Sequence, residues 1–216
     1  NDFKHIAGRE LSIIRNGFDH ADFEETVDTL DNHFSICHIG SMNKDRNPES
    51  LWSALKTLVT DNSFSSKLSI KLIGQVDHSI FQSIENHGLT KFLNHIPFLN
   101  HKEALTELQK SQVLLLPIND TPNSLGVVPG KIYEYLGARR PIIGIGPTEG
   151  DSAAILEESN AGKMFKYDDV KGLKTQLLSF FELYSNSNLK VQHGEIMQFS
   201  RKAMAKSYTN LLENIT

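Results

Sequence analysis

Lys131 and Glu134 stand three positions apart in a glycine- and proline-rich passage, residues 119–136 (NDTPNSLGVVPGKIYEYL). Pro129 fits the first turn of a helix, and Gly130 would let a ligand approach the backbone closely. On that helix Lys131 and Glu134 share a face. The lysine could meet a phosphate, and the carboxylate could accept both hydroxyls of a ribose. The same spacing also fits a plain salt bridge on a solvated helix.

A second loop has the composition of an anion site. Residues 40–50 (GSMNKDRNPES) contain Gly40, Ser41, Lys44 and Arg46. A helix is expected over 48–60, with Asn47 as its cap and Pro48 at its first position. A helix start offers unpaired N–H groups and partial positive charge, and a flanking Lys or Arg adds full charge for a phosphate. A solvated loop with ordinary basic residues is the alternative.

A third passage, IIGIGPTEGD, approaches the dinucleotide fingerprint through Gly144 and Gly146. Glu149 occupies the third glycine position, where its carboxylate would oppose a pyrophosphate. An NAD(P)-binding oxidoreductase domain would need Asp168 or Asp169 for the ribose. The fingerprint belongs after the first strand of a sheet, and here it follows the fifth expected strand.

Other kinds of chemistry find little support in the 216 residues. Cys37 is the single cysteine, and its apolar run FSICHIG favours a core position. The nine histidines show no i, i+4 pair, so no metal is expected. The net charge of -4 and the scattered Lys and Arg residues disfavour nucleic-acid binding. No apolar run could span a membrane and no signal peptide is evident, so we expect a cytoplasmic location.

The elements that position these loops alternate along the chain from residue 34. Strands are expected over 34–39, 68–73, 91–96, 112–116, 141–145 and 161–165. Helices are expected over 48–60, 78–87, 101–110, 130–138, 150–158 and 169–183. This pattern predicts an α/β fold with a doubly wound, Rossmann-like parallel sheet of about six strands. Ligands of such sheets bind beyond the carboxyl ends of the strands, where the three loops would lie.

The two ends of the chain depart from this alternation. In residues 1–33, LSIIRNGFD predicts a short strand with an Asn-Gly turn, and the acidic stretch after it is typical of an interdomain linker. Residues 34–194 would form the binding domain. Residues 195–216 predict a helix, and because no strand follows, it should pack back across the domain.

The order of several segments resembles the C-terminal domain of family four glycosyltransferases of the GT-B fold. These segments are IIRNGFDHADF, HIGSMNKDRNPESLWSAL, KLIGQV, FLNHIPFLNHKEALTELQKSQVLLLPI, PGKIYEYLGARRPIIGIG and FSRKAMAKSYTNLLENI. The resemblance implies transfer of a hexose-type sugar from a nucleoside diphosphate donor such as a UDP-sugar to a saccharide or lipid-linked acceptor. It also implies no metal or other cofactor, because helix N-termini and basic side chains neutralise the departing diphosphate.

The resemblance also assigns residues. The family has two glutamates separated by seven residues; Glu134 matches the second, which holds the ribose, and Gly126 stands at the first. Ser41 replaces an arginine, so Lys44 and Arg46 would contact the diphosphate. The implied set of residues that bind the donor nucleotide is Gly40, Ser41, Lys44, Arg46, Gly74, Phe98, Leu99, His101, Val128, Pro129, Gly130, Lys131 and Glu134. Phe98, Leu99 and His101 would meet the base.

An N-terminal acceptor-binding domain of the same enzyme is the implied partner. It would carry the catalytic base and any peripheral membrane contact, so this chain is expected to be an excised domain that is inactive alone. A non-catalytic α/β interaction module remains an alternative, as does a sugar-nucleotide epimerase or a phosphorylase of the same architecture. An epimerase would need acids that the sequence does not show.

Overall fold

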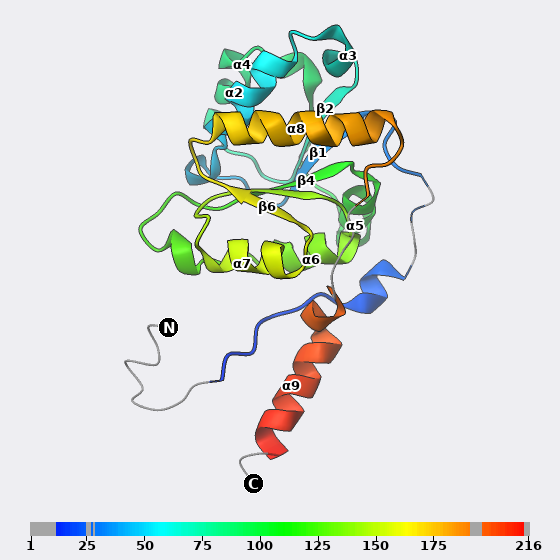
Figure 1. Cartoon of the computed structure of the whole chain (residues 1–216), viewed down its shortest axis with the longest axis vertical. Helices are drawn as coiled ribbons and strands as arrows, with labels where there is room; N and C mark the ends of the chain where they lie inside the picture. Colours follow the sequence, from blue (N-terminus) through cyan, green and yellow to red (C-terminus); the bar gives the residue numbers. More distant parts are fainter. Residues whose placement is uncertain (1–11, 25–26, 28, 191–195, 214–216) are drawn as a thin grey trace.

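The computed structural model describes residues 12–24, 27, 29–190 and 196–213. One parallel sheet runs through the domain in the order β3-β2-β1-β4-β5-β6, with helices on both faces (Figure 1). Its strands are β1 Phe34–Ile39, β2 Leu68–Ile73, β3 Leu93–Ile96, β4 Val113–Pro117, β5 Ile142–Ile145 and β6 Gly162–Phe165. The predicted fold class is confirmed, and each strand begins and ends within two residues of its expected position.

The helices follow the predicted alternation. The α-helices are α2 Glu49–Leu58, α3 Asn62–Ser65, α4 His78–Asn86, α5 His101–Lys110, α6 Lys131–Ala138, α7 Asp151–Glu158, α8 Val170–Ser185 and α9 Arg201–Glu213. The short 3-10 segments are η1 His20–Phe23, η2 Lys44–Arg46, η3 Thr90–Phe92, η4 Ser124–Gly126 and η5 Ile196–Phe199. The α3 turn was not predicted, because four residues carry too little periodicity to identify a helix.

The predicted start of α2 is wrong by one position. Pro48 is the N-cap residue, and it is followed by the first helical residue, Glu49. Asn47 does not cap the helix: its side-chain oxygen accepts a hydrogen bond from Trp52 Nε1 at 2.8 Å, and its amide donates to Glu49 at 2.6 Å. The side-chain oxygen of Asn47 therefore bonds to the buried tryptophan and not to the first amides of the helix.

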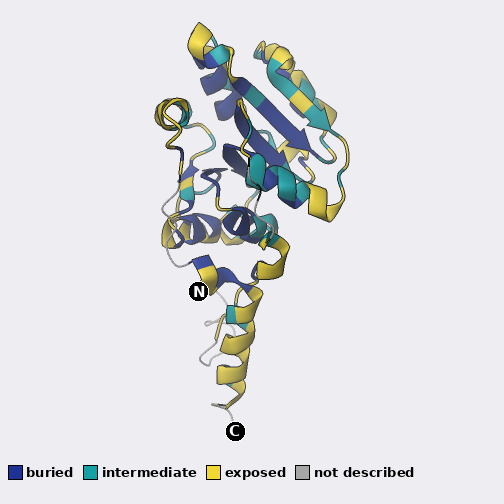
Figure 2. Ribbon diagram, turned by 90° about the vertical axis from the view of Figure 1, so that its right-hand side faces the viewer, coloured by how far each residue is buried: buried dark blue, intermediate teal, exposed yellow. Residues whose placement is uncertain are grey.

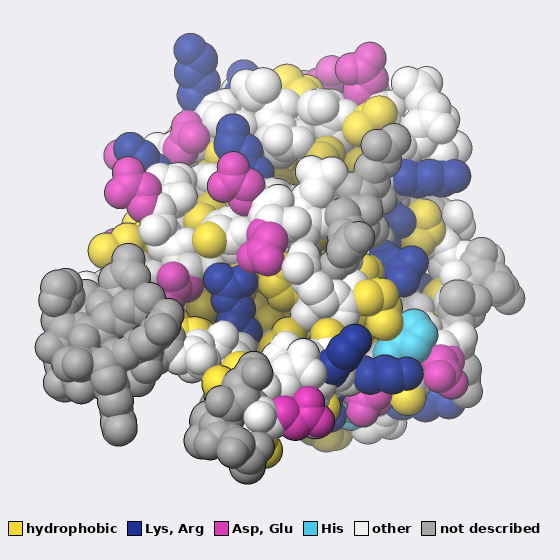
Figure 3. Space-filling model, turned by 60° about the horizontal axis from the view of Figure 1, so that its bottom comes forward, with side chains coloured by type: hydrophobic (Ala, Val, Ile, Leu, Met, Phe, Trp, Pro, Cys, Tyr) yellow, Lys and Arg dark blue, Asp and Glu magenta, His cyan; other side chains and the backbone are white. Residues whose placement is uncertain are grey.

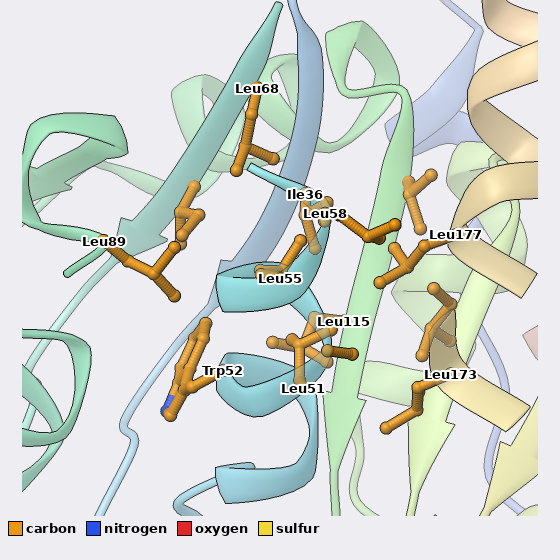
Figure 4. Packing of buried hydrophobic residues seen from close by; sticks show 14 of the residues in the cluster. Ile36, Leu51, Trp52, Leu55, Leu58, Leu68, Leu89, Leu115, Leu173 and Leu177 are labelled. Carbon is orange, nitrogen blue, oxygen red and sulfur yellow. The ribbon is translucent and has the colours of Figure 1, made fainter. Parts of the chain in front are cut away.

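Two apolar cores lie on opposite faces of the sheet. On one face, α2, α4 and α8 cover the strands, and leucines of α2 meet leucines of α8 over β1 and β4 (Figures 1 and 4). On the other, α5, α6 and α7 pack over β1, β4 and β5. Cys37 lies in this second core, where burial raises the pKa of its thiol to about 12, so the predicted core role is confirmed.

A buried lysine ties the start of the domain to α5. Lys71 in β2 is only 5% exposed, and its ammonium contacts Asp31 at 2.9 Å and Glu107 at 2.5 Å. The two carboxylates compensate the cost of burying the charge, and they hold the pKa of Lys71 above its usual value despite that burial. Asp31 joins the domain through this contact although it lies in the segment expected to be a linker.

Replacing Lys71 by Met should destabilise the domain by about 2 kcal/mol, because Asp31 and Glu107 would lose their shared buried cation. Urea unfolding at neutral pH measures the loss. Lys171→Met is the matched control, since Lys171 is exposed on α8 and should change stability by less than about 0.5 kcal/mol. Equal stabilities of the two variants would show that the Lys71 cluster adds nothing.

The N-terminal segment contradicts the expected strand and Asn-Gly turn. Residues 12–17 form no strand, and Phe18 makes a one-residue bridge with Ser200. A Cβ on Gly17 would lie 2.6 Å from the carbonyl oxygen of Phe199, so the glycine permits this close backbone approach instead of a turn. Part of the predicted strand, Leu11, lies outside the described residues.

The predicted C-terminal helix is present in part, but it does not pack back across the domain. The preceding segment η5 makes that contact, with Ile196 and Phe199 buried. The helix α9 has no buried residue among those described and projects away from the sheet (Figures 1 and 2). Residues 195 and 214–216 of the predicted helix lie outside the described residues.

Candidate functional site

The sheet opens between its two central strands. β1 and β4 pair only through Ile36 with Val113 and through Cys37 with Leu114, and beyond these residues the two strands separate. The chain leaves β1 toward β2 and leaves β4 toward β5, so this is the topological switch point of the sheet. Doubly wound folds bind ligands in the crevice at that point.

Two side chains fill the opening where the ladder stops. The hydroxyl of Tyr135, on α6, accepts a hydrogen bond from the amide of Ile39 at 3.0 Å and donates to the carbonyl of Leu115 at 3.3 Å. In a continuous parallel ladder the amide of Ile39 would donate directly to the carbonyl of Leu115, and the phenol lies between these two groups. His38 Nδ1 lies 3.0 Å from the same carbonyl of Leu115.

Two glycines form a backbone shelf beyond the strands. Gly40 follows β1 with a φ of +104°, and Gly74 follows β2 with a φ of +116°, a region that favours glycine. A Cβ on Gly74 would lie 2.8 Å from the carbonyl oxygen of Gly40, so the two residues stand against each other. A Cβ on Gly40 would lie 3.0 Å from Lys131 Nζ. The structure thus brings these three predicted residues together.

Lys131 begins α6, and its ammonium lies over this shelf. Gly130 is the N-cap residue, so α6 starts one residue later than expected and Pro129 precedes its first turn. Glycine has no side chain, so no side-chain hydrogen bond caps the helix. Burial, and then the charge of Arg46, lower the pKa of Lys131 to about 8. A partly desolvated ammonium at an uncapped helix start is suited to an anion.

Arg46 links the loop after β1 to the loop after β4. Its Nε donates to the side-chain oxygen of Asn119, and its Nη1 donates to the carbonyl of Ser41 at 3.1 Å. The amide of Asp120 also donates to the carbonyl of Asp45 at 2.9 Å. These bonds fix a half-buried guanidinium close enough to Lys131 to lower the pKa of that lysine. Sequence reasoning missed Asn119.

Two other predicted diphosphate contacts lie further out. Ser41 and Lys44 are both exposed, and Ser41 contributes its carbonyl to Arg46. Lys44 interacts electrostatically with Asp77 at the start of α4. The structure therefore brings Arg46 close to Lys131, whereas Lys44 lies nearer to the start of α4.

Glu134 lies one turn along α6 from Lys131. Burial raises the pKa of this half-buried carboxyl, whose charge interacts with His101 and Lys131, with Asp22 and with Arg201. The ammonium of Lys131 contacts His38, with 3.2 Å between Nζ and Nε2. Among the described residues, Lys131 and Glu134 therefore do not form the plain salt bridge that their spacing allows. Their two charges still interact electrostatically.

The residues predicted to meet the base border α5. Phe98 is 79% exposed, and Leu99 packs against the core beside α5 and α6. His101 begins α5 behind a capping box formed by Asn100, and its Nε2 lies 3.4 Å from Asp22. The exposed ring of Phe98 offers a face on which a base could stack.

The loop before α6 leaves room where the expected carboxylate is absent. Gly126 ends η4, and a Cβ built on it would meet nothing within 4 Å. Val128 is partly buried against the second core, and the neighbouring carbonyl of Val127 accepts a hydrogen bond from Ser152 at 2.7 Å. Packing therefore does not require a glycine at position 126.

The glycines of the dinucleotide-like passage serve packing. A Cβ on Gly144 would lie 2.7 Å from Met164 Sδ, and one on Gly146 would lie 2.9 Å from Ile118 Cβ. Asp169 accepts a hydrogen bond from the amide of Gly172 and caps α8. These residues form a strand contact and a helix cap, which gives no support to the oxidoreductase alternative.

Neither a metal site nor a membrane-spanning helix is found among the described residues. Among those residues no group of three His, Cys, Asp or Glu side chains could hold a metal ion. None of their helices is long and apolar enough to cross a membrane. On the face seen in Figure 3, Lys and Arg side chains are interspersed with Asp and Glu side chains.

Solved structures with the same fold are found at low sequence identity. A glycosyltransferase of Rickettsia africae gives a TM-score of 0.71 at 15% identity, over 94% of this chain and 57% of that one. Anabaena HepE in complex with UDP and glucose gives 0.70 at 14%, over 94% and 56%. Sucrose-phosphate synthase of Thermosynechococcus elongatus gives 0.71 at 14%, over 94% and 52%. No protein-family model matches the sequence, and no similar sequence is found among curated proteins.

The fold is therefore that of the C-terminal type of domain in GT-B glycosyltransferases. This chain spans between 52% and 57% of the length of the three proteins named above. Likeness at this level of identity establishes the architecture alone.

Proposed function

We propose that this chain is the nucleotide-sugar-binding domain of a glycosyltransferase. The observation that carries the proposal is the convergence of Lys131, Arg46 and the Gly40 backbone at the switch point of the sheet. Two cations beside a backbone shelf and a helix start suit a diphosphate. The structure of HepE, which shares the fold, holds UDP and glucose, and this supports a UDP-sugar as the donor.

Six of the predicted residues have a role in this proposal. Lys131 and Arg46 neutralise the diphosphate that departs when the sugar is transferred, which stabilises the developing charge without a metal ion or other cofactor. Glu134 accepts the ribose hydroxyls, and Phe98 offers its ring to the base. Gly40 and Gly74 keep the shelf free of side chains. The transferred group is a hexose-type sugar, and the acceptor is a saccharide or a lipid-linked saccharide.

A second domain would complete the enzyme. The acceptor site and the catalytic base belong to an N-terminal domain in this proposal, and the protein works in the cytoplasm. Transfer by the present chain alone should be negligible, because the reacting groups would not be held together.

Isothermal calorimetry with UDP, GDP, ADP and NAD in parallel tests the proposal and identifies the base. Binding of one nucleoside diphosphate supports it. Binding of NAD alone would instead favour the oxidoreductase hypothesis, in which Gly144 and Gly146 contact the dinucleotide. If none of the four nucleotides binds at millimolar concentration, the result would contradict nucleotide binding by this domain and favour an interaction module.

Replacing Glu134 by Ala should weaken binding of that nucleotide by about 1 to 3 kcal/mol, because two hydrogen bonds from ribose hydroxyls to a carboxylate would be lost. The matched control is Glu157→Ala, which removes an exposed carboxylate from α7. Calorimetry should give the control the wild-type affinity. Wild-type affinity in Glu134→Ala as well would remove Glu134 from the site.

A further inference from the structure

His38 is a fully buried polar residue in a largely apolar strand. It lies in β1, two residues before Gly40, and its side chain has no exposed surface. Its ring occupies the opening between β1 and β4, and both ring nitrogens have partners: Nδ1 lies 3.0 Å from the carbonyl of Leu115, and Nε2 lies 3.2 Å from Lys131 Nζ. A buried imidazole with both nitrogens engaged has one defined orientation.

The partners determine where the proton is. A carbonyl can only accept, so Nδ1 must carry the hydrogen that is donated to Leu115. Burial, and then the charge of Lys131, outweigh the backbone carbonyls of Leu115 and Ser41 and lower the pKa of His38 to about 3, so the ring is neutral at physiological pH. Nε2 therefore presents a lone pair. An ammonium has three donors and no acceptor, so Lys131 donates to His38.

This bond gives a flexible side chain a fixed anchor. Lysine has a long stem with several rotatable bonds, and its ammonium would otherwise sample many positions. The ring of His38 is held by the strand, by Leu115 and by its own burial. One donor of the ammonium is used for the ring, and the ammonium remains beside the Gly40 backbone with donors left for an anion.

We propose that His38 is a positioning residue, which holds the Lys131 ammonium over the Gly40 shelf through the lone pair of Nε2 and so prepares the site for a diphosphate. This inference rests on the proposed function for its ligand, but the bond itself exists in the free protein. The competing explanation is that His38 only fills the opening between the strands, and in that case the acceptor at Nε2 would have no consequence.

Two amide variants separate these explanations, because each reproduces one ring nitrogen. In His38→Asn the amide can donate to Leu115 from the position of Nδ1, but it cannot reach Lys131. In His38→Gln the longer amide offers an oxygen to Lys131 at the level of Nε2. We expect His38→Gln to bind UDP within about twofold of wild type and His38→Asn to bind about tenfold more weakly, the size of one hydrogen bond to a charged group. Equal affinities of the two variants would overturn the proposal.

The nitrogen-15 shifts of the His38 ring test the same bond without a nucleotide. The proposal requires a protonated Nδ1 and an unprotonated Nε2 at neutral pH in the full chain. A proton on Nε2, or a charged ring, would overturn it, since Lys131 could not then donate to that nitrogen. This measurement decides the matter if a variant fails to fold. A wild-type protein that has this tautomer but binds no nucleotide would refute the proposed function and retain the positioning contact.

Discussion

Replacing Lys131 by Met should weaken UDP binding by about 3 kcal/mol, roughly a hundredfold in Kd. The methionine keeps most of the apolar stem and removes the ammonium that stands beside Gly40 and His38. A charge-assisted contact to a diphosphate is strong there, because Lys131 is partly desolvated before the ligand arrives. Calorimetry at about 0.15 M salt measures the loss with long-range charge effects screened.

Lys44→Met is the matched control for this prediction. Lys44 carries the same charge on the loop after β1, but its side chain is exposed and lies near Asp77. Its loss should change the affinity by about threefold or less, because exposed charges are screened by solvent and salt. A Lys44 variant that binds as weakly as Lys131→Met would show that the field of the whole loop, and not the anchored ammonium, holds the anion.

The second large effect is on stability in acid. His38 should make the domain less stable by about 3 kcal/mol at about pH 4 than at neutral pH, from its own titration alone. Burial, and then the charge of Lys131, lower the pKa of His38 from 6.5 to about 3 in the folded protein. Between these values the unfolded chain binds a proton that the folded protein excludes. Stability therefore falls as the pH drops below 6.5, by about 1.4 kcal/mol for each pH unit.

Urea unfolding of wild type and His38→Gln, each at neutral pH and at about pH 4, isolates this contribution. Glutamine does not titrate, so the variant retains the response of all other groups. The loss on acidification should be smaller in the variant by about 3 kcal/mol. Parallel losses in the two proteins would show that the ring takes up its proton without penalty and is not buried as described.

The fold could be predicted from the sequence because a parallel sheet covered on both faces produces a regular alternation of apolar runs and amphipathic segments along the chain. Strands such as VLLLP are buried on both sides and appear as short apolar runs, and the amphipathic segments between them become the covering helices. The loops that carry Gly40, Gly74 and Lys131 were located for the same reason. The carboxyl ends of parallel strands must meet at one edge.

The rest depended on contacts that local patterns do not encode. His38 is a polar residue in an apolar run, which could have marked it, but its role follows from the separation of β1 and β4. Asn47 matched a capping pattern and was recruited by Trp52 instead. Apolar residues at helical spacing predicted the C-terminal helix, yet the direction in which α9 leaves the domain is set by η5 and its contact with α6.

Mapping a UDP titration onto the amide spectrum of the free domain reports both whether the nucleotide binds and where it binds. Saturable shifts are expected at Gly40 and Gly74 and through residues 130–134, at the switch point of the sheet. Shifts gathered instead around Gly146 and Asp168, or a spectrum unchanged at millimolar UDP, would contradict binding at the switch point.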